Sequence, residues 1–159
     1  MLRQSYPELV LKVVGSNFQT EVEAELCQFP GVEMIGRVES LHKLYNECCL
    51  NVAPVAFGAG TSIKALDSFA YARSCVMNRY ASRWLEDLPS KLKDTLISDS
   101  ISEMMTLIDG ILNRCDKIGG LCSDWLQANR SNGAFETAVT ESIASSRQRV
   151  VSKGSGLRV

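Results

Sequence analysis

Short apolar runs alternate with helical segments through the first hundred residues, and this alternation constrains the fold more than any other feature. The helical segments cover residues 18–29, 40–46 and 61–72. Strands that alternate with helices predict a parallel sheet, and strands that are apolar throughout predict burial on both faces. The sequence therefore predicts an α/β fold, a Rossmann-like parallel sheet with helices on both faces. The expected strands are Leu9–Val14, Val32–Ile35, Cys49–Ala53, Ser74–Met77 and a weaker fifth at Thr95–Ser98.

The chain after Ser100 is expected to be helical to about residue 146. Gly119–Gly120 and Ser131–Gly133 are expected to divide it into three helices. An apolar stripe marks the first of them, at Ile101, Met104, Met105, Ile108, Ile111 and Leu112. We expect one domain over residues 1–146 and a solvated tail over 147–159, where apolar residues are scarce.

Composition excludes several classes of protein. The net charge of -1 argues against a nucleic-acid partner, and no apolar run is long enough to span a membrane. The first residues do not resemble a signal peptide, so we expect a cytoplasmic protein. Six cysteines without a C-x-x-C pair, and one histidine, His42, predict reduced thiols rather than a metal site. Neither a metal nor another cofactor is expected.

One stretch, PVAFGAGTSIKALDSFA at residues 54–70, carries the strongest chemical signal. Gly58 and Gly60 allow a tight turn after a strand, and Thr61 and Ser62 begin the next helix, whose N-terminus favours an anion. Lys64 adds a cation, and Asp67 places a carboxylate near it on the same helical face. These parts suit a phosphorylated sugar or a nucleotide. The alternative is a glycine-rich turn that only reverses the chain. The stretch matches neither the P-loop nor G-x-G-x-x-G, since Ile63 replaces the third glycine.

This stretch resembles the nucleotide-sugar-binding half of retaining glycosyltransferases of the GT-B architecture, the group 1 or family 4 type. Many members have proline, a few residues, Gly-Ala-Gly, Lys-x-x-Glu-Ala and then a buried strand. Here the same order reads PVAFGAGTSIKALDSFAYARSCV, preceded by LVLKVVGSN and GVEMIGRVESLHKLYNECCLNVAP and followed by DTLISDSISEMMTLIDGILN. The resemblance spans roughly Pro7 to Ala144. It implies half of a GT-B fold and the transfer of a sugar from a nucleotide diphosphate sugar.

The resemblance also implies roles for particular residues. Gly15 ends a strand of the nucleotide-sugar site, and Gly36, Arg37 and Val38 match the loop that meets the base. Lys64 would neutralise phosphate charge, and Asp67 stands where the family has a ribose-binding glutamate. Ala72 and Ser74 stand where many members have Gly and Pro. The residues matching the loop that faces the diphosphate and the donor sugar are Gly58, Ala59, Gly60, Thr61 and Ser62.

The family's first donor-domain strand and its N-terminal acceptor domain have no counterpart in the matched sequence, so we expect the chain alone to be inactive. The partners expected are a nucleotide sugar and either an acceptor domain or a second copy bound at an exposed sheet edge. Membrane contact is not indicated. A non-catalytic or degenerate nucleotide-binding or interaction module is the alternative function, and an unrelated flavodoxin-like domain is a third. Packing is favoured over ligand stacking for the aromatic residues Tyr45, Tyr71, Tyr80, Trp84 and Trp125.

Overall fold

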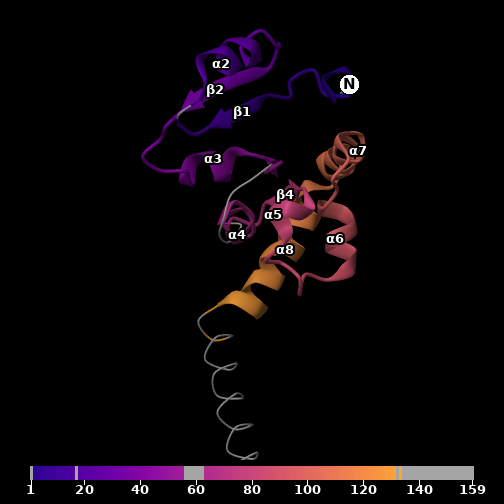
Figure 1. Cartoon of the computed structure of the whole chain (residues 1–159). Helices are drawn as coiled ribbons and strands as arrows, with labels where there is room; N and C mark the ends of the chain where they lie inside the picture. The colour runs from indigo at the N-terminus through magenta and orange to yellow at the C-terminus, as the bar shows by residue number, and fades with distance from the viewer. Residues whose placement is uncertain (1, 17, 56–62, 132, 134–159) are drawn as a thin grey trace, which may run out of the picture.

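The computed structural model describes residues 2–16, 18–55, 63–131 and 133. Within these residues the chain forms four strands and eight helices, which confirms the α/β class (Figure 1). The strands are β1 (Leu11–Val14), β2 (Val32–Gly36), β3 (Leu50–Ala53) and β4 (Ser74–Met77). The helices are α1 (Leu2–Ser5), α2 (Thr20–Leu26), α3 (His42–Glu47), α4 (Ile63–Ala70), α5 (Arg79–Ser82), α6 (Ser90–Leu96), α7 (Ile101–Leu112) and α8 (Cys115–Arg130).

The described strands form two parallel pairs rather than one continuous sheet. β1 pairs with β2, and Leu11 lies opposite Val32 at the start of that register. β3 pairs with β4, and Leu50 lies opposite Ser74. In each pair a helix joins one strand to the next parallel strand, α2 in the first pair and α4 in the second, as parallel pairing requires. The carboxyl ends of paired strands therefore meet at one edge of each pair.

The hydrophobic core surrounds β4. All four β4 residues are completely buried, and α4, α5, α6, α7 and α8 all contact the strand. Phe69 on α4 lies edge-on to Trp125 on α8, with their ring centroids 6.0 Å apart. Burial of this apolar surface is the main stabilising contribution to the fold. The expected burial of an apolar parallel strand is confirmed for β4.

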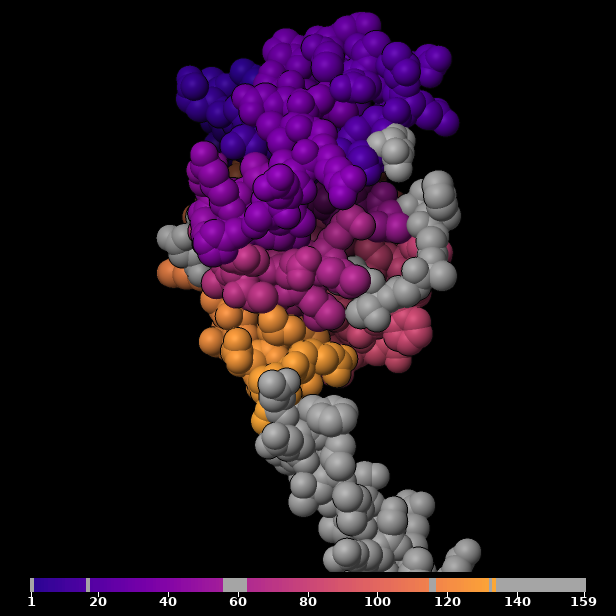
Figure 2. Space-filling view, turned by 90° about the vertical axis from the view of Figure 1, so that its left-hand side faces the viewer, coloured from indigo at the N-terminus to yellow at the C-terminus, as the bar shows by residue number. Residues whose placement is uncertain are grey.

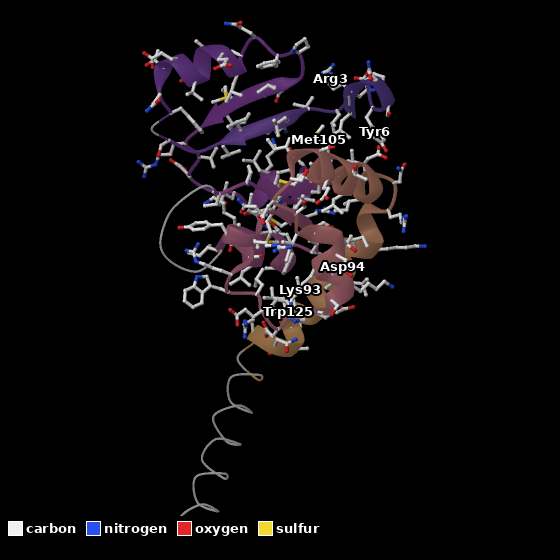
Figure 3. The ribbon with its side chains drawn as sticks, turned by 45° about the vertical axis from the view of Figure 1, so that its right-hand side comes forward. Arg3, Tyr6, Lys93, Asp94, Met105 and Trp125 are labelled. Atoms are coloured by element: carbon white, nitrogen blue, oxygen red, sulfur yellow. The ribbon has the colours of Figure 1, made fainter. Side chains whose placement is uncertain are left out.

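The same expectation is wrong for β1 and β2. No residue of α1, β1, α2 or β2 is buried, and Leu11 keeps 51% of its surface exposed. This region lies at one end of the molecule, and α8 lies toward the other (Figure 2). It contacts the rest through Leu2, which packs on the core, and through a 3.7 Å ion pair between Lys12 and Glu47. α1 also lies beside α7, with Tyr6 directly after it (Figure 3), and burial together with the nearby Asp109 of α7 raises the pKa of Tyr6.

Several elements differ from the sequence-based prediction. The segment Thr95–Ser98 is not a strand, because α6 continues to Leu96 and only Ile97 forms a bridge, to Met77. Leu92 and Leu96 are four residues apart and both buried, so helical spacing buries these side chains together. The short α1 was not expected. In α7 the predicted apolar stripe is buried at Met104, Ile108 and Ile111, whereas Ile101 is exposed.

Gly119 and Gly120 do not divide the C-terminal segment, because α8 runs through both of them. A β-carbon on Gly119 would lie 2.0 Å from the carbonyl oxygen of Ala72, so the absence of a side chain lets α8 approach the turn before β4. Ala72 itself has a φ of 51°, a left-handed conformation that glycine adopts without steric cost. This backbone angle explains why glycine suits that position in the resembling sequences.

Candidate functional site

The ends of β1 and β2 meet at a pair of glycines. The backbone N–H of Gly15 donates a 2.9 Å hydrogen bond to the carbonyl oxygen of Gly36. Gly36 has a φ of 70°, a left-handed conformation that turns the chain sharply after β2. Arg37 follows with an exposed side chain, and Val38 is half-buried. The structure thus brings Gly15 and Gly36 together at the carboxyl edge of the first strand pair, where ligands bind in open α/β sheets.

Lys64 and Asp67 lie on one side of α4. Ala65 and Phe69, on the other side of this helix, are completely buried, so the buried side sets the orientation of α4. Lys64 is exposed and Asp67 is half-buried. Lys64 lies in the first turn, where the backbone N–H groups of a helix carry partial positive charge. The two side chains therefore offer a cation and a carboxylate near the carboxyl end of β3.

Five predicted site residues lie outside the described residues: Gly58, Ala59, Gly60, Thr61 and Ser62. Their roles remain predictions. In the part of the chain that the structure describes, no hydrogen bond or ion pair joins Gly15, Gly36, Arg37 or Val38 to Lys64 or Asp67. The candidate site therefore consists of two separate groups, one on each strand pair.

Tyr45 of α3 lies near Asp67 of α4, a proximity that no sequence pattern indicates. Burial raises the pKa of Tyr45, and the negative charge of Asp67 raises this pKa further. Tyr45 stacks on Tyr71, with ring centroids 5.0 Å apart and planes 7° from parallel. Arg73 donates hydrogen bonds to the carbonyl oxygens of Tyr45 and Asn46, at 3.0 and 2.8 Å. These contacts hold α3 against α4.

Asn78 connects the carboxyl ends of β3 and β4. Its side-chain amide donates a 2.8 Å hydrogen bond to the carbonyl oxygen of Val55, directly after β3. Its side-chain oxygen accepts from the N–H of Ala81 at 3.0 Å and so caps α5. An asparagine between a strand and a helix is a typical N-cap, and this signal could have identified it from sequence. Asn78 fixes the position at which the loop after β3 leaves the sheet.

The other expectations concern thiols, metals and membranes. Burial raises the pKa of both Cys75 and Cys122 to about 12, so these thiols are protonated and unreactive at neutral pH. Cys27 and Cys49 are free and exposed. His42 is also exposed. Among the described residues, no group of three or more histidine, cysteine or acidic side chains could hold a metal, and no helix could cross a bilayer.

A family model described as glycosyl transferases group 1 matches residues 1–113. The match includes both strand pairs, the glycine pair and α4. No curated protein matches the chain.

Proposed function

Because this chain belongs to the group 1 glycosyl transferases, we propose that it binds the nucleotide diphosphate sugar from which such an enzyme takes its sugar. The single observation that carries the proposal is the glycine pair at the carboxyl edge of β1 and β2. At Gly36 the backbone carries no side chain and leaves room for a flat ligand to approach closely, whereas the ring of Phe18 lies 3.4 Å from the position of a β-carbon on Gly15. No atom lies within 4 Å of the position that a β-carbon on Gly36 would occupy.

In this proposal the base lies against Gly36, Arg37 and Val38. The ribose hydroxyls hydrogen-bond the carboxylate of Asp67, and the diphosphate lies near the ammonium group of Lys64. Carboxylate oxygens accept hydrogen bonds from a diol, and an ammonium group at a helix N-terminus attracts phosphate. Tyr45 of α3 lies near Asp67, and burial and then the negative charge of Asp67 raise the pKa of Tyr45.

The reaction of the whole enzyme would be a retaining sugar transfer. The bond between the anomeric carbon and the phosphate oxygen breaks, and that oxygen leaves with the nucleotide diphosphate. An acceptor hydroxyl oxygen forms the new bond to the anomeric carbon on the same face, and its proton passes to the leaving diphosphate oxygen. Lys64 and the N-terminus of α4 would stabilise the negative charge that develops on the leaving diphosphate. The acceptor and its binding residues would come from another domain or chain.

Isothermal titration calorimetry tests this proposal directly. UDP, GDP and ADP are titrated into the chain and into its Lys64→Ala and Asp67→Ala variants. We expect saturable binding of one nucleotide, weakened about five-fold to hundred-fold in each variant, because each loses a charge-assisted contact worth about 1–3 kcal/mol.

A matched control separates a specific contact from a general loss of positive charge. Lys91 is also exposed and lies on α6, so Lys91→Ala removes one lysine away from α4. This variant should bind the nucleotide as the unaltered chain does. Absence of binding by all three nucleotides to the folded chain would contradict the proposal and favour the non-catalytic interaction module.

A further inference from the structure

An exposed pair of aromatic side chains follows β4, outside the groups described above. Trp84 keeps 53% of its surface exposed and Tyr80 keeps 38%. The guanidinium carbon of Arg83 lies 4.4 Å from the centre of the Tyr80 ring, and an Arg83 N–H donates a 2.9 Å hydrogen bond to the Tyr80 carbonyl oxygen. We call Tyr80, Arg83 and Trp84 the aromatic ledge. Core or half-buried packing was expected for both rings, and both are instead exposed.

The ledge is anchored, so its exposure does not result from a loose segment. Ala81 and Leu85 are four residues apart and both buried, whereas Tyr80 and Trp84 are also four residues apart and both exposed. This spacing places the two pairs on different faces of a single helical turn. Asn78 caps the start of the turn, and the N–H of Arg79 donates a 2.9 Å hydrogen bond to the carboxylate of Asp99.

The position of the ledge indicates which part of a ligand it could meet. The ledge begins three residues after the end of β4, at the carboxyl edge that β4 shares with β3. The Asn78 side chain hydrogen-bonds Val55 and so joins the first turn of the ledge to the chain after β3. The loop that follows Val55 is the segment expected to face the donor sugar. The base is expected instead at Gly36–Val38, on the other strand pair. A ring bound at the ledge would therefore lie near the expected position of the donor sugar and not near that of the base.

We propose that the aromatic ledge stacks against a pyranose ring of the carbohydrate substrate, a proposal that rests on the proposed function. The C–H groups on one face of a pyranose pack against an aromatic ring, and burying the apolar surface of Trp84 makes this contact favourable. The pyranose belongs either to the nucleotide sugar or to the acceptor. Both sources share this chemistry, and the experiment distinguishes them.

Fluorescence provides the measurement, because the chain has two tryptophans and only one of them is exposed. Trp125 is 7% exposed, so acrylamide quenches mainly Trp84. The difference between the unaltered chain and Trp84→Phe isolates the Trp84 signal, and an exposed Trp→Phe change does not disturb the core. The ligands are UDP-glucose, UDP-galactose, GDP-mannose and ADP-glucose, the corresponding free nucleotides, and the free disaccharides maltose and mannobiose.

We expect at least one sugar-bearing ligand to protect Trp84 from acrylamide saturably, and the corresponding free nucleotide to leave it unprotected. Protection by a nucleotide sugar assigns the ledge to the donor, and protection by a free disaccharide assigns it to the acceptor. Trp84→Ala should weaken binding of the same ligand about five-fold, in line with one aromatic stacking contact. Ile101→Ala, which removes an exposed apolar side chain from α7, should leave this affinity unchanged.

Two results would overturn the ledge as a sugar platform. One is equal protection of Trp84 by a free nucleotide, which would indicate a bound base. The other is no saturable protection by any sugar-bearing ligand, whether or not nucleotides bind. Calorimetry with free nucleotides tests the proposed function separately, so nucleotide binding without protection of Trp84 by a sugar would leave that function standing and reject the ledge.

Discussion

The two strand pairs share a parallel topology but differ completely in burial. β4 is enclosed by five helices, and each of its four residues is inaccessible to solvent. β1 and β2 are also mainly apolar, although each contains one charged residue, Lys12 or Glu33, and none of their residues is buried. Both pairs carry groups of the proposed site. The difference shows that an apolar parallel strand acquires a core only when enough helices pack on it, since backbone pairing alone contributes little net stability.

The comparison predicts unequal costs for removing side chains from the two regions. Phe69→Ala should lower the free energy of unfolding by about 3–5 kcal/mol, because it leaves a cavity between α4 and α8. Val13→Ala on β1 should cost no more than about 1 kcal/mol, because Val13 is only half-buried. Urea denaturation of both variants measures the difference. Similar losses in the two variants would show that β1 belongs to the same cooperative core as β4.

Neighbouring glycines in α8 provide a sharper test of close packing around β4. Gly119→Ala should destabilise the chain by about 1–3 kcal/mol, because its β-carbon would collide with the backbone at Ala72. Gly120→Ala should stabilise it by about 0.5–1 kcal/mol, because nothing lies within 4 Å of that β-carbon and alanine favours helix. The two thermal unfolding midpoints should move in opposite directions. A stabilising Gly119→Ala would mean that α8 does not pack closely on this turn.

Alkaline pH should weaken the β4 region selectively. The pKa of Cys75 and Cys122 is raised by burial from 9.0 to about 12, so both thiols stay protonated in the folded chain while they ionise in the unfolded chain. Their contribution to stability is complete below pH 9 and is lost as the pH rises toward 12. Urea midpoints from about pH 8 to about pH 11 should therefore fall.

Replacement of the buried thiols tests that explanation. In the variant with both Cys75→Ala and Cys122→Ala, the urea midpoint should fall less steeply with pH, although Tyr45, whose pKa is also raised, still contributes. Cys27→Ala, which changes an exposed cysteine of the other region, should keep the full slope. An unchanged slope in the double variant would assign the alkaline loss to other groups.

Sequence patterns predicted the strands well and their surroundings poorly. Ser74–Met77 was predicted with the observed bounds, because a short apolar run between a helix and an asparagine has few other interpretations. Burial of β1 could not be predicted, because it depends on which helices pack on the strand. Thr95 and Leu96 were assigned to a strand because the four residues Thr95–Ser98 were considered without Leu92. With Leu92 included, the spacing is helical.

The candidate site was predictable to a similar degree. Gly15 and Gly36 were identified as strand ends, but the hydrogen bond between them depends on register, which the sequence does not specify. Gly119 was interpreted as a helix break because glycine has a low intrinsic helix propensity. Propensity does not show that α8 needs a glycine here to pack closely against Ala72. Tyr45 was assigned to packing, which is confirmed, while its proximity to Asp67 required the tertiary structure.

The Gly15–Gly36 hydrogen bond lies in the region without buried residues, and this location affects affinity. Segments with little buried surface open locally more often than the core does. A ligand that needs both glycines in place binds only the closed population, so its apparent dissociation constant is the intrinsic one divided by that population. Binding in turn pulls the segment toward the closed form. For a ligand that needs both Gly15 and Gly36 in place, binding and local folding of this segment are one coupled equilibrium.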